Sequence, residues 1–309
     1  MLITILTPCY NEVNNVEKLY LAIKNIFLTS YPDLKYNHLF IDNCSNDGTI
    51  EALKSLAKND NNVKLIINSR NFGHIRSPYY GLLEAQGDAV IIMSSDFQDP
   101  PEIINDLIKK WNEGYDSVLA IKSKSKENKI LYKIRTLYYK ILESLADIKI
   151  YKNFYGCGLY SRKVINELKK INDPYPFFRG LIAEVGYKIV TIEYTQNKRL
   201  NGYSKNKFYD LYDLGVLGII SNSKIPLRLA VFGGAISSLM SLFVGFGYFV
   251  AKLLYWDDII LGMTPIIILM SFMFSIMLFF IGIIGEYIGA IYTQCMNRPL
   301  VHEQERVNF

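Results

Sequence analysis

The stretch that begins at Val90 joins a short apolar run to a cluster of polar side chains. Asp96 and Gln98 follow almost directly after this run, which has the length and composition of a buried strand. Ligands of open α/β sheets bind just beyond the carboxyl ends of the strands, so we expect both side chains at a ligand site. Their hard oxygen atoms predict a site for Mg²⁺ or Mn²⁺ beside a diphosphate. The alternative is an ordinary strand-to-helix turn with Asp99 as the N-cap.

Two other predicted strands end in turns suited to binding a nucleotide. The apolar runs 2–7 and 38–41 are followed by polar turns that begin at Pro8 and Asp42. Tyr10, in the first turn, offers an aromatic face on which a base can stack. The carboxylate of Asp42 only accepts hydrogen bonds, which suits a uracil or a ribose, although a simple capped loop would also account for this turn. The carboxyl ends of parallel strands share one edge of the sheet, so the three turns are expected to converge.

Strands and helices alternate along residues 1–200, which predicts an α/β fold with a parallel sheet. Apolar, β-rich runs are separated by segments with helical spacing or by polar turns. The predicted strands cover residues 2–7, 38–41, 63–67, 89–93 and 117–121.

The overall composition narrows the classes of function. The net charge is +5 without any dense run of Lys and Arg, which argues against a nucleic-acid partner and fits phosphate-bearing substrates or an anionic membrane face. The four cysteines form no CxxC pair, so we expect neither a zinc site nor a disulfide framework, and a reducing, cytosolic setting. Residues 2–6 read as a strand without a preceding basic segment, so no signal peptide is expected.

The last third of the chain is strongly apolar. Leu227–Leu254 has no acidic residue, and Met263–Ile284 has no charge at all. A membrane core needs about 20 apolar residues to be crossed, and a charge at its centre costs at least about 2.5 kcal/mol. Both segments are therefore predicted to be transmembrane helices. Two buried helices of a soluble bundle are the alternative, and they would have to be apolar on every side.

The charges that flank these segments predict their orientation and the domain boundaries. Lys224 and Arg228 lie near the start of the first span and Arg298 follows the second, so the positive-inside rule predicts that both termini are cytoplasmic, in the inner (plasma) membrane. Residues 201–226 are expected to be an amphipathic juxtamembrane segment on the bilayer, or else a plain linker helix. The resulting division is 1–200, 201–226, 227–293 and a cytoplasmic tail, 294–309.

Taken together, these motifs resemble glycosyltransferase family 2, in particular its polyprenyl-phosphate branch, which includes dolichol-phosphate mannose synthase and bactoprenol glucosyltransferases. The resemblance covers nearly the whole chain. It rests on Pro8-x-Tyr10-Asn11-Glu12, Asp42-x-x-Ser45-x-Asp47-Gly48-Thr49, Arg70-Asn71-Phe72-Gly73, Asp96-x-Gln98-Asp99-Pro100-Pro101, Arg199-x-x-Gly202-x-Ser204-Lys205, Gly285-Glu286-Tyr287-Ile288-Gly289 and Arg298-Pro299.

The resemblance implies a GT-A fold and an inverting, metal-dependent transfer from a nucleotide sugar, UDP-linked rather than GDP-linked, to a polyprenyl phosphate. Asp96 and Gln98 would hold Mg²⁺ or Mn²⁺. The implied nucleotide-sugar site comprises Pro8, Tyr10, Glu12, Asp42, Ser95, Lys122, Arg199 and Lys205. The implied catalytic residues are Asp96, Asp99, Arg199 and Lys205, of which the last two would clamp phosphates.

Two positions depart from the family pattern. Ser94 stands where the metal motif usually has a first carboxylate, which removes one anionic ligand and is expected to weaken metal binding. Gly156 stands where relatives usually carry an Asp that is assigned as a base or an acceptor contact. A phosphate monoester has a second pKa near 6, so at neutral pH it is mostly a dianion that needs little help from a base. The loss at Gly156 is therefore compatible with a phosphate acceptor.

Other functions remain open from the sequence. A hydroxyl acceptor on a lipid-linked glycan would need a base, for which Asp99 and Glu184 are the candidates. A nucleotide-sugar binding protein weakened in catalysis by Ser94 is a third possibility. A transporter is the weakest, because two spans without internal charges offer no polar path. Small residues such as Gly233 and Gly245 would allow close helix packing within the chain or in a homo-oligomer.

Overall fold

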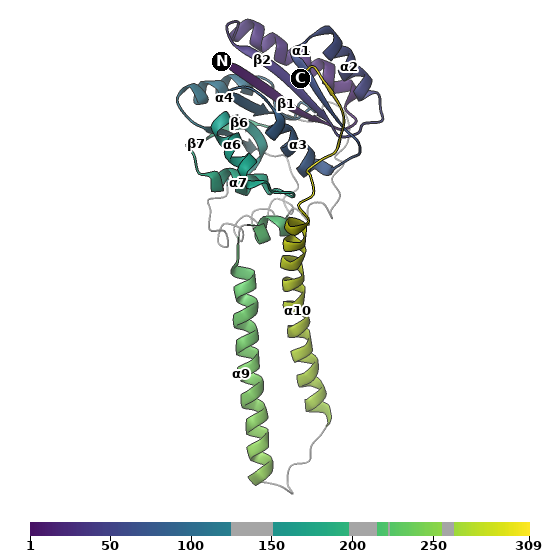
Figure 1. The fold of residues 1–309 in the computed structure, drawn as a ribbon. Helices are drawn as coiled ribbons and strands as arrows, with labels where there is room; N and C mark the ends of the chain where they lie inside the picture. The colour runs from purple at the N-terminus through teal and green to yellow at the C-terminus, as the bar shows by residue number, and fades with distance from the viewer. Residues whose placement is uncertain (125–150, 198–214, 222, 255–262) are drawn as a thin grey trace.

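An eight-stranded sheet forms the centre of the globular part (Figure 1). The computed structural model describes residues 1–124, 151–197, 215–221, 223–254 and 263–309. The strand order within these residues is β7-β5-β6-β4-β1-β2-β3-β8. The strands are β1 (Leu2–Cys9), β2 (Lys35–Asp42), β3 (Val63–Asn68), β4 (Ala89–Ile92), β5 (Ser117–Lys124), β6 (Phe154–Ser161), β7 (Ile189–Thr195) and β8 (Glu303–Val307).

The first four strands are parallel, because a helix carries the chain back to the start of the sheet after each of the first three. β4, β1, β2 and β3 are neighbours in register, with Cys9 opposite Asp42 and Leu6 opposite Ile92. β6 runs antiparallel to both β4 and β5, and β7 is parallel to β5. The predicted α/β fold with a mostly parallel sheet is therefore confirmed.

Helices cover both faces of the sheet, so most strands are buried on both sides and are apolar throughout. One face packs against α1 (Val13–Ser30), α2 (Thr49–Asn59) and α4 (Ile103–Asn112). The other face packs against α3 (Gly73–Glu84), α6 (Arg162–Ile171) and α7 (Phe178–Val185). Alternate side chains of β1 point to the two faces: Ile5 joins the first core and Leu6 the second.

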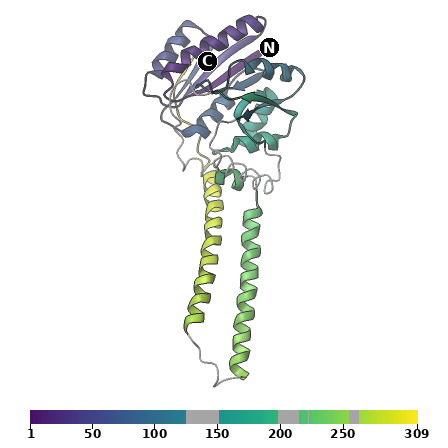
Figure 2. The same cartoon turned by 180° about the vertical axis from the view of Figure 1, so that it is seen from behind.

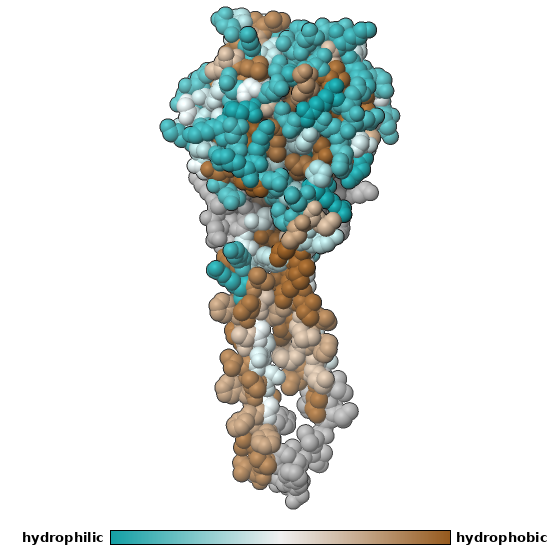
Figure 3. Space-filling model, in the orientation of Figure 1, coloured by the Kyte–Doolittle hydropathy of each residue, from teal (hydrophilic) through white to brown (hydrophobic). Residues whose placement is uncertain are grey.

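Two long apolar helices, α9 (Ile225–Leu254) and α10 (Met263–Met296), extend together from one end of the globular part (Figures 1 and 2). By length and composition, Ile225–Ala251 and Leu269–Met296 are long and apolar enough to cross a membrane, and only 6% and 0% of their most apolar stretches are buried. Apolar side chains cover their outer surface (Figure 3). Helices of a soluble bundle would bury these side chains, so this exposure favours association with a membrane.

After α10 the chain returns to the sheet. β8 pairs antiparallel with β3, and Leu65 lies opposite Val307. Just before β8, the carbonyl of His302 accepts a hydrogen bond from the Ser69 N–H (2.9 Å). The sequence analysis treated residues 294–309 as a tail, whereas these residues supply the edge strand of the sheet. Consequently, α9 and α10 leave from and return to one and the same folded unit.

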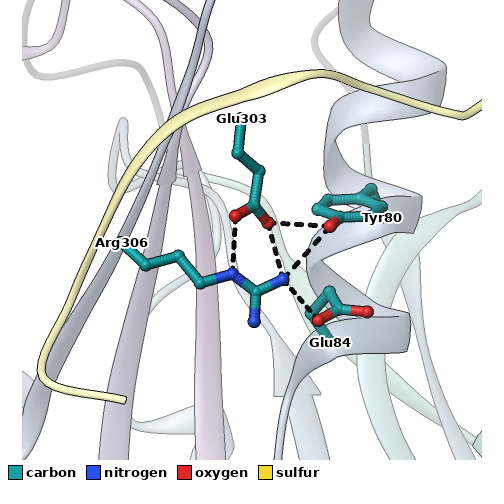
Figure 4. Close-up of polar contacts among 4 residues, drawn as sticks. All are labelled: Tyr80, Glu84, Glu303 and Arg306. Atoms are coloured by element: carbon teal, nitrogen blue, oxygen red, sulfur yellow. Dashed lines mark hydrogen bonds and ion pairs between the residues drawn. The ribbon is translucent and has the colours of Figure 1, made fainter.

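Arg306 fastens β8 to α3 (Figure 4). Its Nε atom donates to Glu303 Oε2 (2.6 Å), and its Nη2 atom donates to Glu303 Oε1 (2.7 Å) and to Glu84 Oε2 (2.5 Å). The hydroxyl of Tyr80 donates to Glu303 Oε1 (2.7 Å). One guanidinium thus pairs with two carboxylates that lie far apart in the sequence.

We expect Arg306→Met to lower the free energy of unfolding of the globular part by about 2 kcal/mol, since two neighbouring carboxylates lose their shared cation. Thermal unfolding in detergent measures this. Lys54→Met is the matched control: Lys54 forms a single pair with Glu305 on the same strand, with the two side chains 45% and 42% exposed. The control should cost less than about 1 kcal/mol, and equal losses in the two variants would contradict the special role of Arg306.

His38 is a buried titratable group in the centre of β2. Its side chain is 0% exposed, its Nε2 atom lies 3.0 Å from Thr7 Oγ1, and its ring stacks on Phe40 at 3.8 Å between centroids. The Nδ1 atom has no hydrogen-bond partner within the described part of the chain. Burial lowers the pKa of His38 from 6.5 to about 3, so the folded protein holds the ring neutral.

The unfolded chain protonates His38 below about pH 6.5 and the folded chain does not, so acid favours unfolding. The stabilisation is complete above the unfolded pKa and is lost as the pH falls towards 3. Linkage gives a loss of about 1.4 kcal/mol between about pH 7.5 and pH 5.5. We expect His38→Gln to remove this part of the pH dependence of thermal unfolding, whereas His302→Gln, at an exposed position, should keep it. An unchanged slope in His38→Gln would contradict the assignment.

Candidate active site

The turns after β1 and β2 are joined by hydrogen bonds between backbone and side chains. The Asn11 N–H donates to Ser45 Oγ (2.8 Å), and the Asn46 N–H donates to Asn11 Oδ1 (2.9 Å). The Glu12 N–H donates to Thr49 Oγ1 (2.9 Å). The two turns therefore form one rigid surface at the carboxyl edge of the sheet.

Two carboxylates organise this surface in different ways. Asp47 accepts from the Val13 N–H (3.3 Å) and the Thr49 N–H (3.0 Å), so it satisfies the first backbone donor of both α1 and α2. Asp42 is 0% exposed, and it accepts from the Ser45 N–H (2.8 Å) and hydroxyl (2.5 Å). Burial raises the pKa of Asp42, and the hydrogen bonds from Ser45 oppose that rise. Asp42 is an enclosed acceptor whose oxygens Ser45 orients.

The turn after β4 carries the candidate metal ligands. Asp96 is 6% exposed, and its Oδ1 atom accepts from the Gln98 N–H (3.1 Å). Between them, Phe97 has a φ of +60°, in the left-handed region that a residue with a bulky side chain rarely adopts. Asn11 (φ +56°) and Cys44 (φ +65°) repeat this conformation in the other two turns. Strained backbone at all three strand ends is typical of a functional site.

Asp99 anchors the turn after β4, which carries the candidate metal ligands and is called the metal turn below, to the rest of the fold. Its Oδ2 atom accepts from the Ser94 hydroxyl (2.6 Å) and, at 3.3 Å, from the Ser94 N–H. Its Oδ1 atom accepts from the hydroxyl of Tyr194, at the far end of the sheet in β7 (2.5 Å). Burial and the charge of Asp99 raise the pKa of Tyr194, so the phenol stays protonated and donates. Both oxygens of this buried carboxylate are therefore occupied.

Lys122 on β5 supplies positive charge to the same region. Burial lowers its pKa, while the charges of Asp99 and Asp96 oppose that shift. Its Nζ atom lies 4.1 Å from the centre of the Tyr155 ring, and the Arg179 guanidinium lies 4.8 Å from the same ring. The sequence analysis included Lys122 as a site residue and missed Tyr155, Arg179 and Tyr194, because no local pattern marks them.

A cavity of about 230 Å³ lies beside these turns, between the strand ends, α3 and the start of α7. Pro8, Ser94 and Asp99 line it from the sheet, and Gly156 and Arg179 line it from the opposite wall. Tyr10, Glu12, Asp42, Asp96 and Gln98 do not line it, so the cavity adjoins the converging turns without containing them.

The donor set fits Mg²⁺ or Mn²⁺. No group of three or more His, Cys, Asp or Glu side chains gathers into a metal cluster within the described ranges. One buried carboxylate, Asp96, and one carboxamide, Gln98, are hard ligands that leave coordination positions for water and a diphosphate, as Mg²⁺ prefers. When bound, such an ion would stabilise negative charge on a leaving diphosphate.

The structure brings most of the predicted residues to one edge. Pro8, Tyr10, Glu12, Asp42, Ser95, Asp96, Gln98 and Asp99 lie on the three adjacent strand ends. Arg199 and Lys205 fall outside the described residues. Glu184 is exposed and borders a separate hollow on α6 and α7, next to Glu167 and Lys170. Gly156 has a φ of +104°, a conformation that an Asp would adopt only with strain.

The sheet order, the three convergent turns and the adjoining cavity define an α/β protein with a polar candidate site at its sheet edge. A model of the family "Glycosyl transferase family 2" matches residues 4–169. The chain belongs to this family, and the resemblance noted from its motifs is confirmed, as is the GT-A type of fold.

Relatives match over nearly the whole length. An "Uncharacterized glycosyltransferase YkcC" of Bacillus subtilis is 35% identical over 302 residues, covering 96% of this chain and 91% of that protein. An "SfII prophage-derived bactoprenol glucosyl transferase" of Shigella flexneri is 31% identical over 303 residues, covering 97% and 96%. Among solved structures, the glucosyl-3-phosphoglycerate synthase of Mycobacterium tuberculosis, in complex with Mn²⁺ and UDP-glucose, is 16% identical with a TM-score of 0.46, covering 71% of this chain and 76% of that one.

Tyr194→Phe tests the anchoring of the metal turn. It leaves a buried carboxylate oxygen of Asp99 without its donor, so the free energy of unfolding should fall by about 1–3 kcal/mol. The control, Tyr187→Phe, removes a hydroxyl that has no hydrogen bond in the described part of the chain and should change stability by less than about 0.5 kcal/mol. Thermal unfolding measures both, and matching values would argue against the anchor.

Proposed function

We propose that this glycosyltransferase moves a sugar, with inversion, from a nucleotide sugar to a polyprenyl phosphate such as undecaprenyl phosphate at the cytoplasmic membrane face. UDP-sugars are the proposed donors rather than GDP-sugars, and Mg²⁺ or Mn²⁺ is the proposed cofactor. The observation that carries this proposal is the convergence of three strained, hydrogen-bonded turns on one sheet edge beside a cavity.

The proposed donor site follows the edge of the sheet. Tyr10 and Asp42 would contact the nucleoside from neighbouring turns, with Pro8, Glu12 and Ser95 around them. Asp96 and Gln98 would reach the diphosphate through the metal. Lys122, half-buried near Asp96 and Asp99, would add positive charge at the phosphates. Arg199 and Lys205 keep their proposed role as phosphate clamps in the segment outside the described residues.

The chemistry of the cavity favours a phosphate acceptor over a hydroxyl. A hydroxyl nucleophile needs a general base, but both oxygens of Asp99 accept hydrogen bonds, from Tyr194 and Ser94. Glu184, the other candidate base, faces a different hollow. Gly156 provides no carboxylate. A phosphate dianion attacks without such help. Arg179, which lines the cavity, would attract it, and so would Lys122, which lies over the ring of the cavity-lining Tyr155.

The proposed multi-pass arrangement has a geometric argument. β8, after α10, pairs with β3, before α9, so the two ends of the helical pair belong to one folded unit. If both helices cross the bilayer, they must form a hairpin with the globular part on one side. Lys224, Arg228 and Arg298 flank the hairpin at that end, and such an excess of cations favours the cytoplasmic face. We also propose a homo-oligomer, because the small residues of α9 would let a helix of a second copy pack closely against it.

The test is transfer by the full chain in detergent with undecaprenyl phosphate, Mn²⁺ and a panel of radiolabelled UDP- and GDP-sugars. We expect label in the lipid phase with one donor, and a loss of at least about 100-fold in Asp96→Asn, which weakens the metal–diphosphate contact. Asp106→Asn, at an exposed position on α4, is the control and should retain full activity. Label that never enters the lipid phase, whatever the donor, would rule out this acceptor.

A further inference from the structure

Two motifs of the sequence have no role in the proposed transfer: the Arg70–Gly73 turn and the Arg298-Pro299 pair. The structure brings them together beside the start of α3. The backbone of Ser69 pairs with that of His302 (2.9 Å), and the Arg76 Nη2 atom donates to the carbonyl of Pro299 (2.6 Å). The segment that leaves α10 therefore runs alongside the turn that leads into α3 (Figure 1).

A buried asparagine fixes the shape of this turn. The Asn43 Oδ1 atom accepts from the Phe72 N–H (2.9 Å), and its Nδ2 atom donates to Asn71 Oδ1 (2.9 Å) and to the Gly73 carbonyl (3.1 Å). Gly73 has a φ of +85°, which favours glycine. Because Asn43 is 7% exposed and follows Asp42 directly, the turn is fixed to the carboxyl end of β2.

The fixed turn and the start of α3 hold two guanidinium groups against one ring. Phe72 is 6% exposed, and the Arg70 and Arg76 guanidiniums lie 4.0 Å and 5.4 Å from its centroid. Arg298 directly precedes Pro299, whose carbonyl accepts from Arg76 Nη2 (2.6 Å). Burial and the positive charges of Arg70 and Arg298 lower the pKa of Arg76. Both charges therefore lie close enough to Arg76 to repel it.

Within the described residues, no carboxylate forms an ion pair with these three arginines, Arg70, Arg76 and Arg298. The Arg76 Nε atom is buried without a hydrogen-bond partner in the described structure. The start of the α3 helix dipole adds further positive potential. An anion with several oxygens would satisfy the free donors and offset the repulsion.

We propose that Arg70, Arg76 and Arg298 form an accessory binding site for a phosphate group, carried by a lipid headgroup or free in solution. None of the three arginines lines the cavity beside the catalytic turns. Arg76 lies on the face of α3 that contacts the C-terminal segment, whereas His74, Pro78 and Tyr79 line the cavity from another face. The site is thus distinct from the cavity and lies where the chain leaves α10.

The test measures binding by the full-length protein in detergent, without turnover. Thermal unfolding and native mass spectrometry are recorded with inorganic phosphate, with phosphatidylglycerol and with phosphatidylcholine, at ionic strength held constant with chloride. Arg298→Gln and Arg70→Gln remove exposed guanidiniums, and Arg76→Gln removes the half-buried one. Lys58→Gln, at an exposed position of α2, is the control for loss of a surface charge.

We expect phosphate to stabilise the protein in a saturable way. Each Arg→Gln variant should weaken the affinity about tenfold or more, as loss of a charged hydrogen bond implies. Lys58→Gln should keep the wild-type affinity. A response to phosphatidylglycerol alone identifies a headgroup site, and a response to inorganic phosphate identifies a free-phosphate site. Binding that is equal in wild type and all Arg variants, or stabilisation matched by chloride, overturns the proposal. Because no turnover is measured, a chain that binds phosphate but transfers no sugar would overturn only the proposed function.

Discussion

The pairing of β8 with β3 is the constraint on which the rest of the molecule depends. Because of this pairing, segments that precede α9 and a segment that follows α10 belong to the same sheet. Arg306 strengthens this pairing by joining Glu303 of β8 to Glu84 of α3. α3 in turn supplies a wall of the cavity beside the site. The same helix therefore contacts the segment that follows α10 and lines the cavity.

The site itself is built from backbone strain that side chains hold in place. Asn11, Cys44 and Phe97 all adopt positive φ, at a cost on the order of 1 kcal/mol each. Ser45 and Thr49 hold the first two turns together, and Asp99 holds the third through Ser94 and Tyr194. Ser94, where the resemblance led us to expect a carboxylate, is a donor to Asp99. A serine at this position therefore helps to fix the turn.

Sequence reasoning reached the parts of the fold that local patterns encode. The parallel strands are apolar because both of their faces are buried, and their ends were recognisable from the polar turns that follow Thr7, Ile41 and Met93. β8 was missed because Glu303–Val307 is a polar edge strand, which alternation of apolar residues does not reveal. The Tyr194–Asp99 bond joins residues 95 positions apart, and no local signal connects them. Positive φ at Phe97 was likewise invisible, since the residue is neither Gly nor Asn.

The place of β8 in the chain also fixes an order of events during synthesis. β3 is made early, but its partner emerges only after both apolar helices, so on the ribosome its edge stays open on the order of tens of seconds. An unpaired strand edge invites association with other chains. The sheet is completed only once both apolar helices have been synthesised. Synthesis of α9 and α10 is thus a step in the maturation of the globular part as well.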